Sequence, residues 1–262
     1  MFWVAILLGI VEGLTEFLPI SSTGHLIVTG DLIGFTGKRA ETFEIFIQLG
    51  AILAVVWEYR ARLSRVALDL PRRVEARRFV FNLFLAFLPA AVCGLAVHDY
   101  ISDHLFSPGT VGAALIAGAL LILLVEALPL KMATGEAESV TWRQSLVIGI
   151  AQCLALWPGF SRSAATILGG MTGGLNRRAA TEFSFFLAIP TMFAATFYDL
   201  IKNFDQLEPG DLTWLAVSFV VSFLVAWVSV RWLLHFVSTH TFRAFAWYRL
   251  AFGAIILVVL YL

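Results

Sequence analysis

Two short polar segments interrupt apolar stretches of the chain, and they hold most of the residues that could do chemistry. Glu12 and Glu16 are four positions apart, so they share one face of the helix expected before Pro19. Three hydroxyl residues and a histidine follow, namely Ser21, Ser22, Thr23 and His25. The second segment supplies Ser161, Arg162 and Ser163.

These side-chain types suit phosphoryl chemistry. Arg162 offers a forked guanidinium for phosphate oxygens, and each break restarts a helix whose free N–H groups favour an anion. Paired carboxylates such as Glu12 and Glu16 can hold a divalent cation that bridges phosphate oxygens. A hydroxyl beside a histidine or a glutamate can act as a nucleophile, with its neighbour as the base.

The composition indicates an integral membrane protein. Of the 262 residues, 60% are hydrophobic and 14% are charged, against about 45–50% and about 25% in ordinary soluble domains. A soluble enzyme of this length could not bury so much apolar surface. The formal net charge of zero gives no indication of a nucleic-acid partner. Cys93 and Cys153 lie in apolar runs and are interpreted as packing residues.

The apolar runs predict an all-α polytopic fold with six transmembrane helices and two re-entrant helix pairs. Phe2–Thr29 is broken at Leu18–His25 and Ser145–Gly170 at Trp157–Ser163, so each is expected to enter the membrane and return. The expected spans are Phe43–Trp57, Phe79–Val97, Thr110–Leu128, Glu182–Leu200, Leu212–Leu233 and Phe245–Leu262.

Basic residues set the expected orientation, because loops rich in lysine and arginine stay cytoplasmic. The loop after the first span is rich in arginine, with Arg60, Arg62, Arg65, Arg72, Arg73, Arg77 and Arg78. The next loop, His98–Ser107, has no lysine or arginine and is expected outside. Both termini then fall on the outer side of the membrane.

The two halves of the chain, about 1–130 and 145–262 of a single membrane domain, resemble each other at an offset of 140. Gly9–Glu12 matches Gly149–Gln152 in this way, and with one-residue gaps the polar breaks also align. Each half is one re-entrant pair followed by three spans, so the second half is inverted relative to the first. Such repeats place a site at their interface near the bilayer midplane.

Structural roles remain open for several of these residues. The serines are natural N-caps, and His25 could form a hydrogen bond within the core. Glu12 could tie two helices together, and Arg162 could pair structurally with a glutamate. Glu126, Asp199 and Arg249, at span ends or within spans, are interpreted as interfacial or packing charges. An ionised side chain at mid-membrane nevertheless costs about 2.5–3.5 kcal/mol, which favours a functional cluster.

The two breaks resemble the signatures of the undecaprenyl-diphosphate phosphatase family of the bacitracin-resistance type. The first signature is Glu12–Leu26, EGLTEFLPISSTGHL, and the second is Trp157–Ser163, WPGFSRS. The segments Phe43–Gly50 and Glu182–Phe185 are also similar, and the resemblance covers essentially the whole chain.

This resemblance implies a bacterial inner-membrane hydrolase that acts on a phosphoric anhydride. It would convert undecaprenyl diphosphate to undecaprenyl phosphate, the lipid carrier for peptidoglycan, and so confer bacitracin resistance. It further implies stimulation by Mg²⁺ or Ca²⁺, contact with membrane lipids, and a homodimer. The family's important residues correspond here to Glu12, Glu16, Ser22, Thr23, His25, Ser161 and Arg162.

The expected mechanism places the diphosphate in a midplane cavity that opens to the outer, periplasmic side. Arg162 and the two helix N-termini, with Ser161, Thr23 and Ser21, would hold the phosphates. Glu12 and Glu16 would bind the cation or position water. Ser22 would be the nucleophile and His25 or Glu16 its base, with attack by His25, a glutamate or cation-activated water left open.

Two other classes of protein share part of this pattern. A secondary transporter or a lipid flippase also fits inverted repeats, broken helices and carboxylates in the membrane. Anion transport requires the arginine but not an oriented pair of serine and histidine, so the local cluster favours a phosphatase.

Overall fold

The computed structural model describes residues 2–105, 107–202 and 212–261, and apart from one isolated bridge between Thr134 and Leu175 its regular structure there is helical. The first half comprises α1 (Phe2–Thr15), α2 (Ser22–Ile33), α3 (Lys38–Glu58), α4 (Arg60–Asp69), α5 (Val74–His104) and α6 (Pro108–Ala127). The second half comprises η1 (Ala137–Ser139), α7 (Trp142–Gln152), η2 (Cys153–Leu156), α8 (Arg162–Thr172), α9 (Arg177–Lys202), α10 (Leu212–Thr239) and α11 (Arg243–Tyr261).

All six expected spans coincide with helices in the described residues. Among those residues, four helices are long and apolar enough to cross a membrane, at Val74–Val97, Pro108–Ala127, Arg177–Tyr198 and Leu212–Thr239. The other two expected spans lie in α3 and α11, which are helical but outside this group, and Leu262 lies outside the described residues. The chain is therefore an all-helical protein with several apolar helices that suit a membrane.

One expected boundary is wrong. The polar residues after Val97 predict a loop at His98–Ser107, but α5 continues to His104. The helical hydrogen-bond pattern continues to the end of α5, where the amide of Leu105 donates to the carbonyl of Ile101 at 2.9 Å. A change from apolar to polar side chains marks where a helix would leave a membrane and does not itself end the helix.

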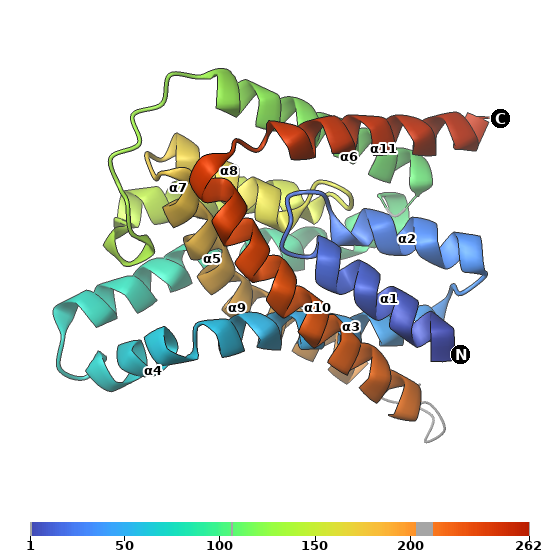
Figure 1. Ribbon diagram of the computed structural model, residues 1–262, viewed down its shortest axis with the longest axis horizontal. Coiled ribbons are helices and arrows are strands. Elements are labelled where there is room, and N and C mark those ends of the chain that lie inside the picture. The colour runs from blue at the N-terminus through green and yellow to red at the C-terminus, as the bar shows by residue number, and fades with distance from the viewer. Residues whose placement is uncertain (1, 106, 203–211, 262) are drawn as a thin grey trace.

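Each polar break turns the chain back on itself, so that α1 packs against α2 and α7 against α8 (Figure 1). Pro19 and Pro158 lie in the breaks, where proline cannot continue the helical hydrogen bonds. Ser21 and Ser161 then cap the returning helices: the Ser21 hydroxyl accepts from the amide of Gly24 at 3.4 Å, and that of Ser161 from Ala164 at 3.2 Å.

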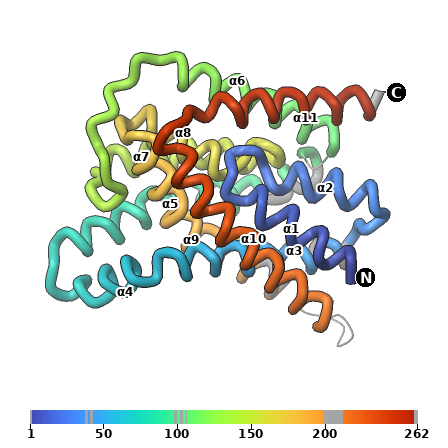
Figure 2. Tube along the Cα trace, in the orientation of Figure 1, coloured from blue at the N-terminus to red at the C-terminus, as the bar shows by residue number. Residues whose placement is uncertain are grey.

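The two helical hairpins are held by long helices from the opposite half of the chain. Helix α1 packs along α10, and α7 packs along α5 (Figure 2). Gly9 and Gly13 of α1, four residues apart, bring its backbone close to α10: a Cβ atom at Gly9 would lie 2.7 Å from the carbonyl oxygen of Ser218. Small residues at this spacing are typical of close helix packing in membranes.

Large apolar side chains cover the outward faces of the long helices. Phe81 of α5 is 57% exposed, Val228 of α10 is 65% exposed and Val259 of α11 is 70% exposed. An apolar surface of this extent is unstable in water and suits contact with lipid.

A cluster of charges fastens α4 to the second half of the chain. Arg62 donates to Glu138 at 2.8 Å and to Glu182 at 2.8 Å. Burial opposes the charge on this guanidinium, but the hydrogen bonds to the two carboxylates outweigh it and hold the pKa of Arg62 above its ordinary value.

Gly13→Ala is expected to destabilise the fold, because the new Cβ would lie 2.7 Å from the Cβ of Val225 and 2.8 Å from the backbone nitrogen of Ala226. Overpacking of this kind costs about 1–3 kcal/mol. The unfolding midpoint in detergent measures the loss. Gly94→Ala is the matched control, since its Cβ would meet only the flexible end of Leu156, at 3.3 Å. A Gly13→Ala protein as stable as this control would contradict the prediction.

Candidate active site

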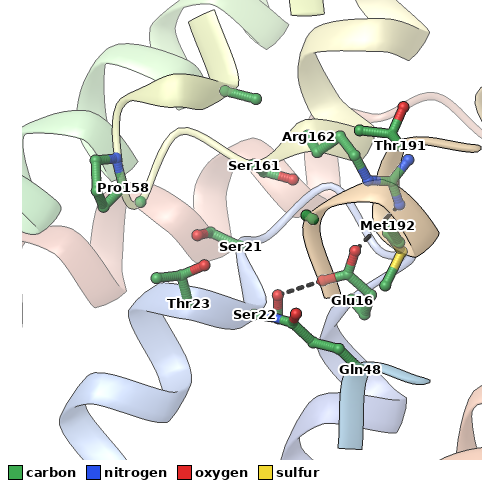
Figure 3. A pocket seen from close by; sticks show the side chains of 13 residues that line it. Glu16, Ser21, Ser22, Thr23, Gln48, Pro158, Ser161, Arg162, Thr191 and Met192 are labelled. Atoms are coloured by element: carbon green, nitrogen blue, oxygen red, sulfur yellow. Dashed lines mark hydrogen bonds and ion pairs between the residues drawn. The ribbon is translucent and has the colours of Figure 1, made fainter. Parts of the chain in front are cut away.

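The two breaks meet at a cavity of about 250 Å³ (Figure 3). Residues of the first break line one side, residues of the second break line another, and α3 and α9 complete the wall. The lining consists of Glu16, Ser21, Ser22, Thr23, Gln48, Ala155, Pro158, Gly159, Ser161, Arg162, Thr191, Met192 and Ala195. Six of the eight residues predicted for the site from the sequence therefore lie around one cavity, and Glu12 and His25 lie outside its lining.

Ser21 and Ser161 adopt the same unusual backbone conformation. Their φ angles are 73° and 78°, a left-handed region that residues other than glycine seldom occupy and that costs about 1–3 kcal/mol. In both breaks this residue immediately precedes a helix, so the free amide groups of α2 and α8 begin at the cavity. Two helix N-termini in one cavity favour an anion there.

Glu16 joins the two breaks through its carboxylate. The Ser22 hydroxyl donates to Oε2 at 2.5 Å, and Nη2 of Arg162 donates to Oε1 at 3.1 Å (Figure 3). The Arg162 and Glu16 side chains are 13% and 10% exposed. A buried carboxylate that accepts a serine hydroxyl is placed to take its proton, so the structure pairs Ser22 with Glu16.

The second break is anchored on both sides of Arg162. The Ser163 hydroxyl donates to the carbonyl of Leu18 in the first break at 2.9 Å, and it lies 3.0 Å from the Ser161 hydroxyl. Nη1 of Arg162 donates to the carbonyl of Ser184 in α9 at 3.3 Å. These contacts hold the guanidinium at the cavity wall with its charge directed to Glu16.

His25 faces away from the cavity, toward α11. Its Nδ1 lies 2.6 Å from the carbonyl oxygen of Ser21, and its Nε2 lies 2.7 Å from the hydroxyl of Tyr248. Its ring stacks on Phe252 with 4.4 Å between the ring centres. Both ring nitrogens therefore have partners other than Ser22, and of the two bases predicted for that serine only Glu16 contacts it.

Glu12 is the second of the two carboxylates that the sequence predicts as cation ligands. Its side chain is fully buried, and neither carboxylate oxygen has a hydrogen-bond partner among the described residues. The charges of Glu16 and Glu44 repel it, whereas that of Arg162 attracts it. The described residues contain no cluster of three metal-binding side chains, but Mg²⁺ commonly uses one or two carboxylates together with substrate phosphate oxygens. Glu12 and Glu16 fit that pattern.

Three polar or charged residues in or beside the cavity were not among the predicted site residues. Gln48 of α3 and Thr191 of α9 line the cavity, but nothing in their local sequence separates them from other polar residues of a helix. Arg249, interpreted as a packing or interfacial charge, is fully buried and donates hydrogen bonds to both breaks. A guanidinium inside an apolar span is the signal that could have identified it. Glu126 by contrast pairs with Arg177 at a helix end, as an interfacial charge would.

Comparison with known proteins gives one consistent result. Residues 5–255 match the family model described as bacitracin resistance protein BacA. A protein of Ectopseudomonas mendocina named undecaprenyl-diphosphatase is 56% identical over 98% of this chain and 93% of its own length. Proteins of the same name from Nitrosospira multiformis and Methylobacillus flagellatus are 56% and 55% identical, over 98% and 97% of this chain and 94% and 96% of their own lengths.

The cavity is expected to bind inorganic pyrophosphate, because two helix N-termini and Arg162 converge on it. Pyrophosphate should raise the unfolding midpoint of the wild type by about 2–4 °C for each kcal/mol of binding free energy. Arg162→Gln should abolish the shift, whereas replacement of the exposed Arg78 by glutamine should leave it unchanged. An equal shift in all three proteins would show that the anion binds elsewhere.

Proposed function

The chain belongs to the BacA family of bacitracin resistance proteins, and on that premise we propose that it hydrolyses undecaprenyl diphosphate to undecaprenyl phosphate and inorganic phosphate. Relatives 56% identical over nearly the whole chain are named for this activity. The observation that carries the proposal for this chain's own residues is the Glu16 carboxylate, which contacts both the Ser22 hydroxyl and Arg162 at one cavity. The product returns to peptidoglycan synthesis as the lipid carrier, which links the activity to bacitracin resistance.

The substrate's phosphates would occupy the cavity, with the prenyl chain leaving between helices toward lipid. Arg162 binds phosphate oxygens with its fork, and the amide groups at the starts of α2 and α8 bind others. Ser161, Ser21 and Thr23 line the same cavity and add hydroxyl groups. When phosphate binds, Arg162 exchanges part of its contact with Glu16 for the phosphate, which leaves the carboxylate more basic.

The reaction would proceed in two displacements at the terminal phosphorus. The Ser22 oxygen attacks, its proton passes to Glu16, and the bond from phosphorus to the bridging oxygen breaks to release undecaprenyl phosphate. Glu16 passes this proton to the departing phosphate and is ionised again. Water then attacks the phosphoserine and gives a proton to Glu16, which passes it to the Ser22 oxygen as the bond from phosphorus to that oxygen breaks. This second step releases inorganic phosphate and restores Ser22. The sum consumes one water molecule. The 2.5 Å contact between Ser22 and Glu16 supports this assignment over a proton transfer to His25.

Glu12 and Glu16 would hold a divalent cation such as Mg²⁺ or Ca²⁺. The buried carboxylate of Glu12, without a hydrogen-bond partner among the described residues, supports this proposal. When bound, the cation would neutralise part of the charge of the diphosphate. Glu12 in this role binds the cation and does not contact the reacting phosphorus.

The membrane arrangement proposed from the sequence, an inverted repeat of re-entrant hairpins, has structural support. Ser21 and Ser161 have similar φ angles, and each caps the helix that follows it. They are 140 residues apart, so the two serines align without the gaps assumed from the sequence. Corresponding helices also pack on each other, α3 with α9 and α6 with α11.

The proposed location is a bacterial inner membrane with the cavity open to the outer, periplasmic side, and the positions of the termini are consistent with this orientation. In Figure 1 both termini lie at the right, and the arginine-rich α4 lies at the left. If the arginines face the cytoplasm, the termini face outward. Homodimer formation stays a prediction of the family resemblance.

Ser22→Ala and Glu16→Gln are expected to abolish phosphate release from undecaprenyl diphosphate or farnesyl diphosphate in detergent. Loss of the base alone should lower kcat by about 10²–10⁴-fold, and Ser22→Ala should also prevent 32P labelling of the protein. EDTA should suppress the wild-type reaction, and added Mg²⁺ or Ca²⁺ should restore it. Ser238→Ala and Glu75→Gln, at exposed positions, are the matched controls.

Each alternative has its own outcome in this assay. No release from folded wild type would contradict the proposed function and favour a transporter or flippase, to be tested with liposomes. Release by Ser22→Ala at the wild-type rate would remove Ser22 as the nucleophile. Labelling of His25 or a glutamate would identify a different attacking group, and full activity in EDTA would exclude a required cation.

A cysteine at position 22 is expected to react with a membrane-impermeant thiol reagent from the periplasmic side. The experiment uses Ser22→Cys with Cys93 and Cys153 replaced by serine. Ser64→Cys on exposed α4 is the control, and it should react only after the membrane is permeabilised. Labelling of the cysteine at position 22 only from the cytoplasm would reverse the proposed orientation.

A further inference from the structure

Arg249 of α11 lies where the two breaks meet. The side chain is fully buried, and its hydrogen bonds within the described part of the chain include none to a carboxylate. Its guanidinium instead donates five hydrogen bonds, all to backbone carbonyl oxygens: Pro19 at 3.1 Å, Leu115 at 3.1 Å, Ala114 at 3.3 Å, Gly159 at 3.2 Å and Phe160 at 2.8 Å.

These acceptors belong to three separate parts of the chain. Pro19 is in the first break, Gly159 and Phe160 are in the second, and the remaining carbonyls belong to α6. Gly118 of α6 leaves the space for the guanidinium, because a Cβ atom there would overlap its Nη2. One side chain therefore fixes both breaks to each other and to α6.

The preceding residue, Tyr248, acts on the first break through His25. A carbonyl oxygen only accepts hydrogen bonds, so Nδ1 of His25 must donate to Ser21, and in the neutral ring Nε2 then accepts from the Tyr248 hydroxyl. The carbonyl of Ser21 belongs to the peptide group that joins Ser21 to Ser22. The Ser21 carbonyl fixes the histidine tautomer, and the hydroxyl of Tyr248 holds the ring in the orientation that contacts this peptide.

We propose that Tyr248 and Arg249 of α11 are positioning residues that orient the two breaks so that Ser22, Glu16 and Arg162 meet in reactive geometry. The inference rests on the proposed function and deepens it, because it assigns a role to two residues that do not line the cavity. Ser21 holds an unfavourable φ angle, which persists only where surrounding contacts over-determine it. His25 contacts the carbonyl of Ser21, and Arg249 contacts the carbonyl of Pro19. The two side chains therefore supply such contacts on both sides of Ile20.

The chemistry depends on this positioning because Ser22 and Arg162 come from different breaks, 140 residues apart in sequence. Displacement of one break by about 1 Å would separate the nucleophile from the phosphate held by the other, and misplacement on that scale can cost about 10²-fold in rate. Substrate binding through the helix N-termini and Arg162 would be less affected. The role therefore predicts a loss in kcat at nearly unchanged KM.

Tyr248→Phe tests the role of Tyr248, since it removes only the hydroxyl and keeps the ring that stacks with Phe252. We expect kcat for phosphate release to fall about 10-fold or more, with KM within twofold of the wild type and an unchanged unfolding midpoint. Tyr100→Phe is the matched control, because Tyr100 also stacks on a histidine, His104, with 4.6 Å between ring centres. The control should keep wild-type kinetics.

A double-mutant cycle tests whether Tyr248 acts through His25. His25→Gln with Tyr248→Phe should be no slower than His25→Gln alone, because the hydroxyl no longer has the imidazole to orient. Multiplicative losses would show that Tyr248 acts independently and would overturn the proposed route. Wild-type kcat in Tyr248→Phe, or a loss that only follows a lowered unfolding midpoint, would also overturn it.

Arg249→Lys tests the guanidinium while retaining the charge. A lysine ammonium has three N–H donors and lacks the planar, forked geometry of a guanidinium. It therefore cannot donate hydrogen bonds to both breaks and to α6 at the same time. We expect kcat to fall by more than 10-fold at unchanged KM, measured on the folded fraction, and Arg249→Gln to retain less activity than the lysine variant. Equal kcat in the wild type and Arg249→Lys would overturn the role. An inactive wild type would instead contradict the proposed function itself.

Discussion

The structure depends on satisfying the backbone polar groups of two breaks that lie inside an apolar protein. A helix satisfies its own N–H and C=O groups, but a break within the apolar layer has no water to replace the lost partners. The serine caps satisfy amide groups at the starts of α2 and α8, and Arg249 satisfies carbonyls of Pro19, Gly159 and Phe160. Without these donors, the breaks would be too costly to keep in the interior.

The aligned breaks also explain how a near-symmetric frame holds an asymmetric reaction. At an offset of 140, Ser22 corresponds to Arg162, and Glu16 corresponds to Leu156. Likewise Glu12 corresponds to Gln152, so both of these acidic positions are neutral in the second half. In the proposed reaction, the first break therefore provides the nucleophile and the base, and the second provides the positive charge. Glu16 forms the contact between them.

The sequence could predict the breaks and most of the cavity, because proline, hydroxyl and charged residues are costly inside apolar runs unless they end a helix or form a site. For that reason, the prediction that Glu16, Ser22 and Arg162 lie at one site is correct. The sequence could not decide between His25 and Glu16 as the partner of Ser22, since that depends on which way α2 faces. The partner of His25 is Tyr248, 223 residues away, and no local pattern relates the two. Arg249 is a buried packing charge, as interpreted, but its acceptors could not be predicted because they are backbone carbonyls, which every residue has.

The position of Arg249 and Tyr248 has a consequence for the order in which the protein is assembled. Helix α11 follows every other helix of the chain, so during synthesis both polar breaks are made long before the guanidinium that fastens them. Helix α1 is likewise synthesised well before α10, the helix against which its glycines pack. Under the proposed roles, the breaks would therefore lack several of their hydrogen-bond donors until α11 is made, and the site would be complete only once α11 has packed against them.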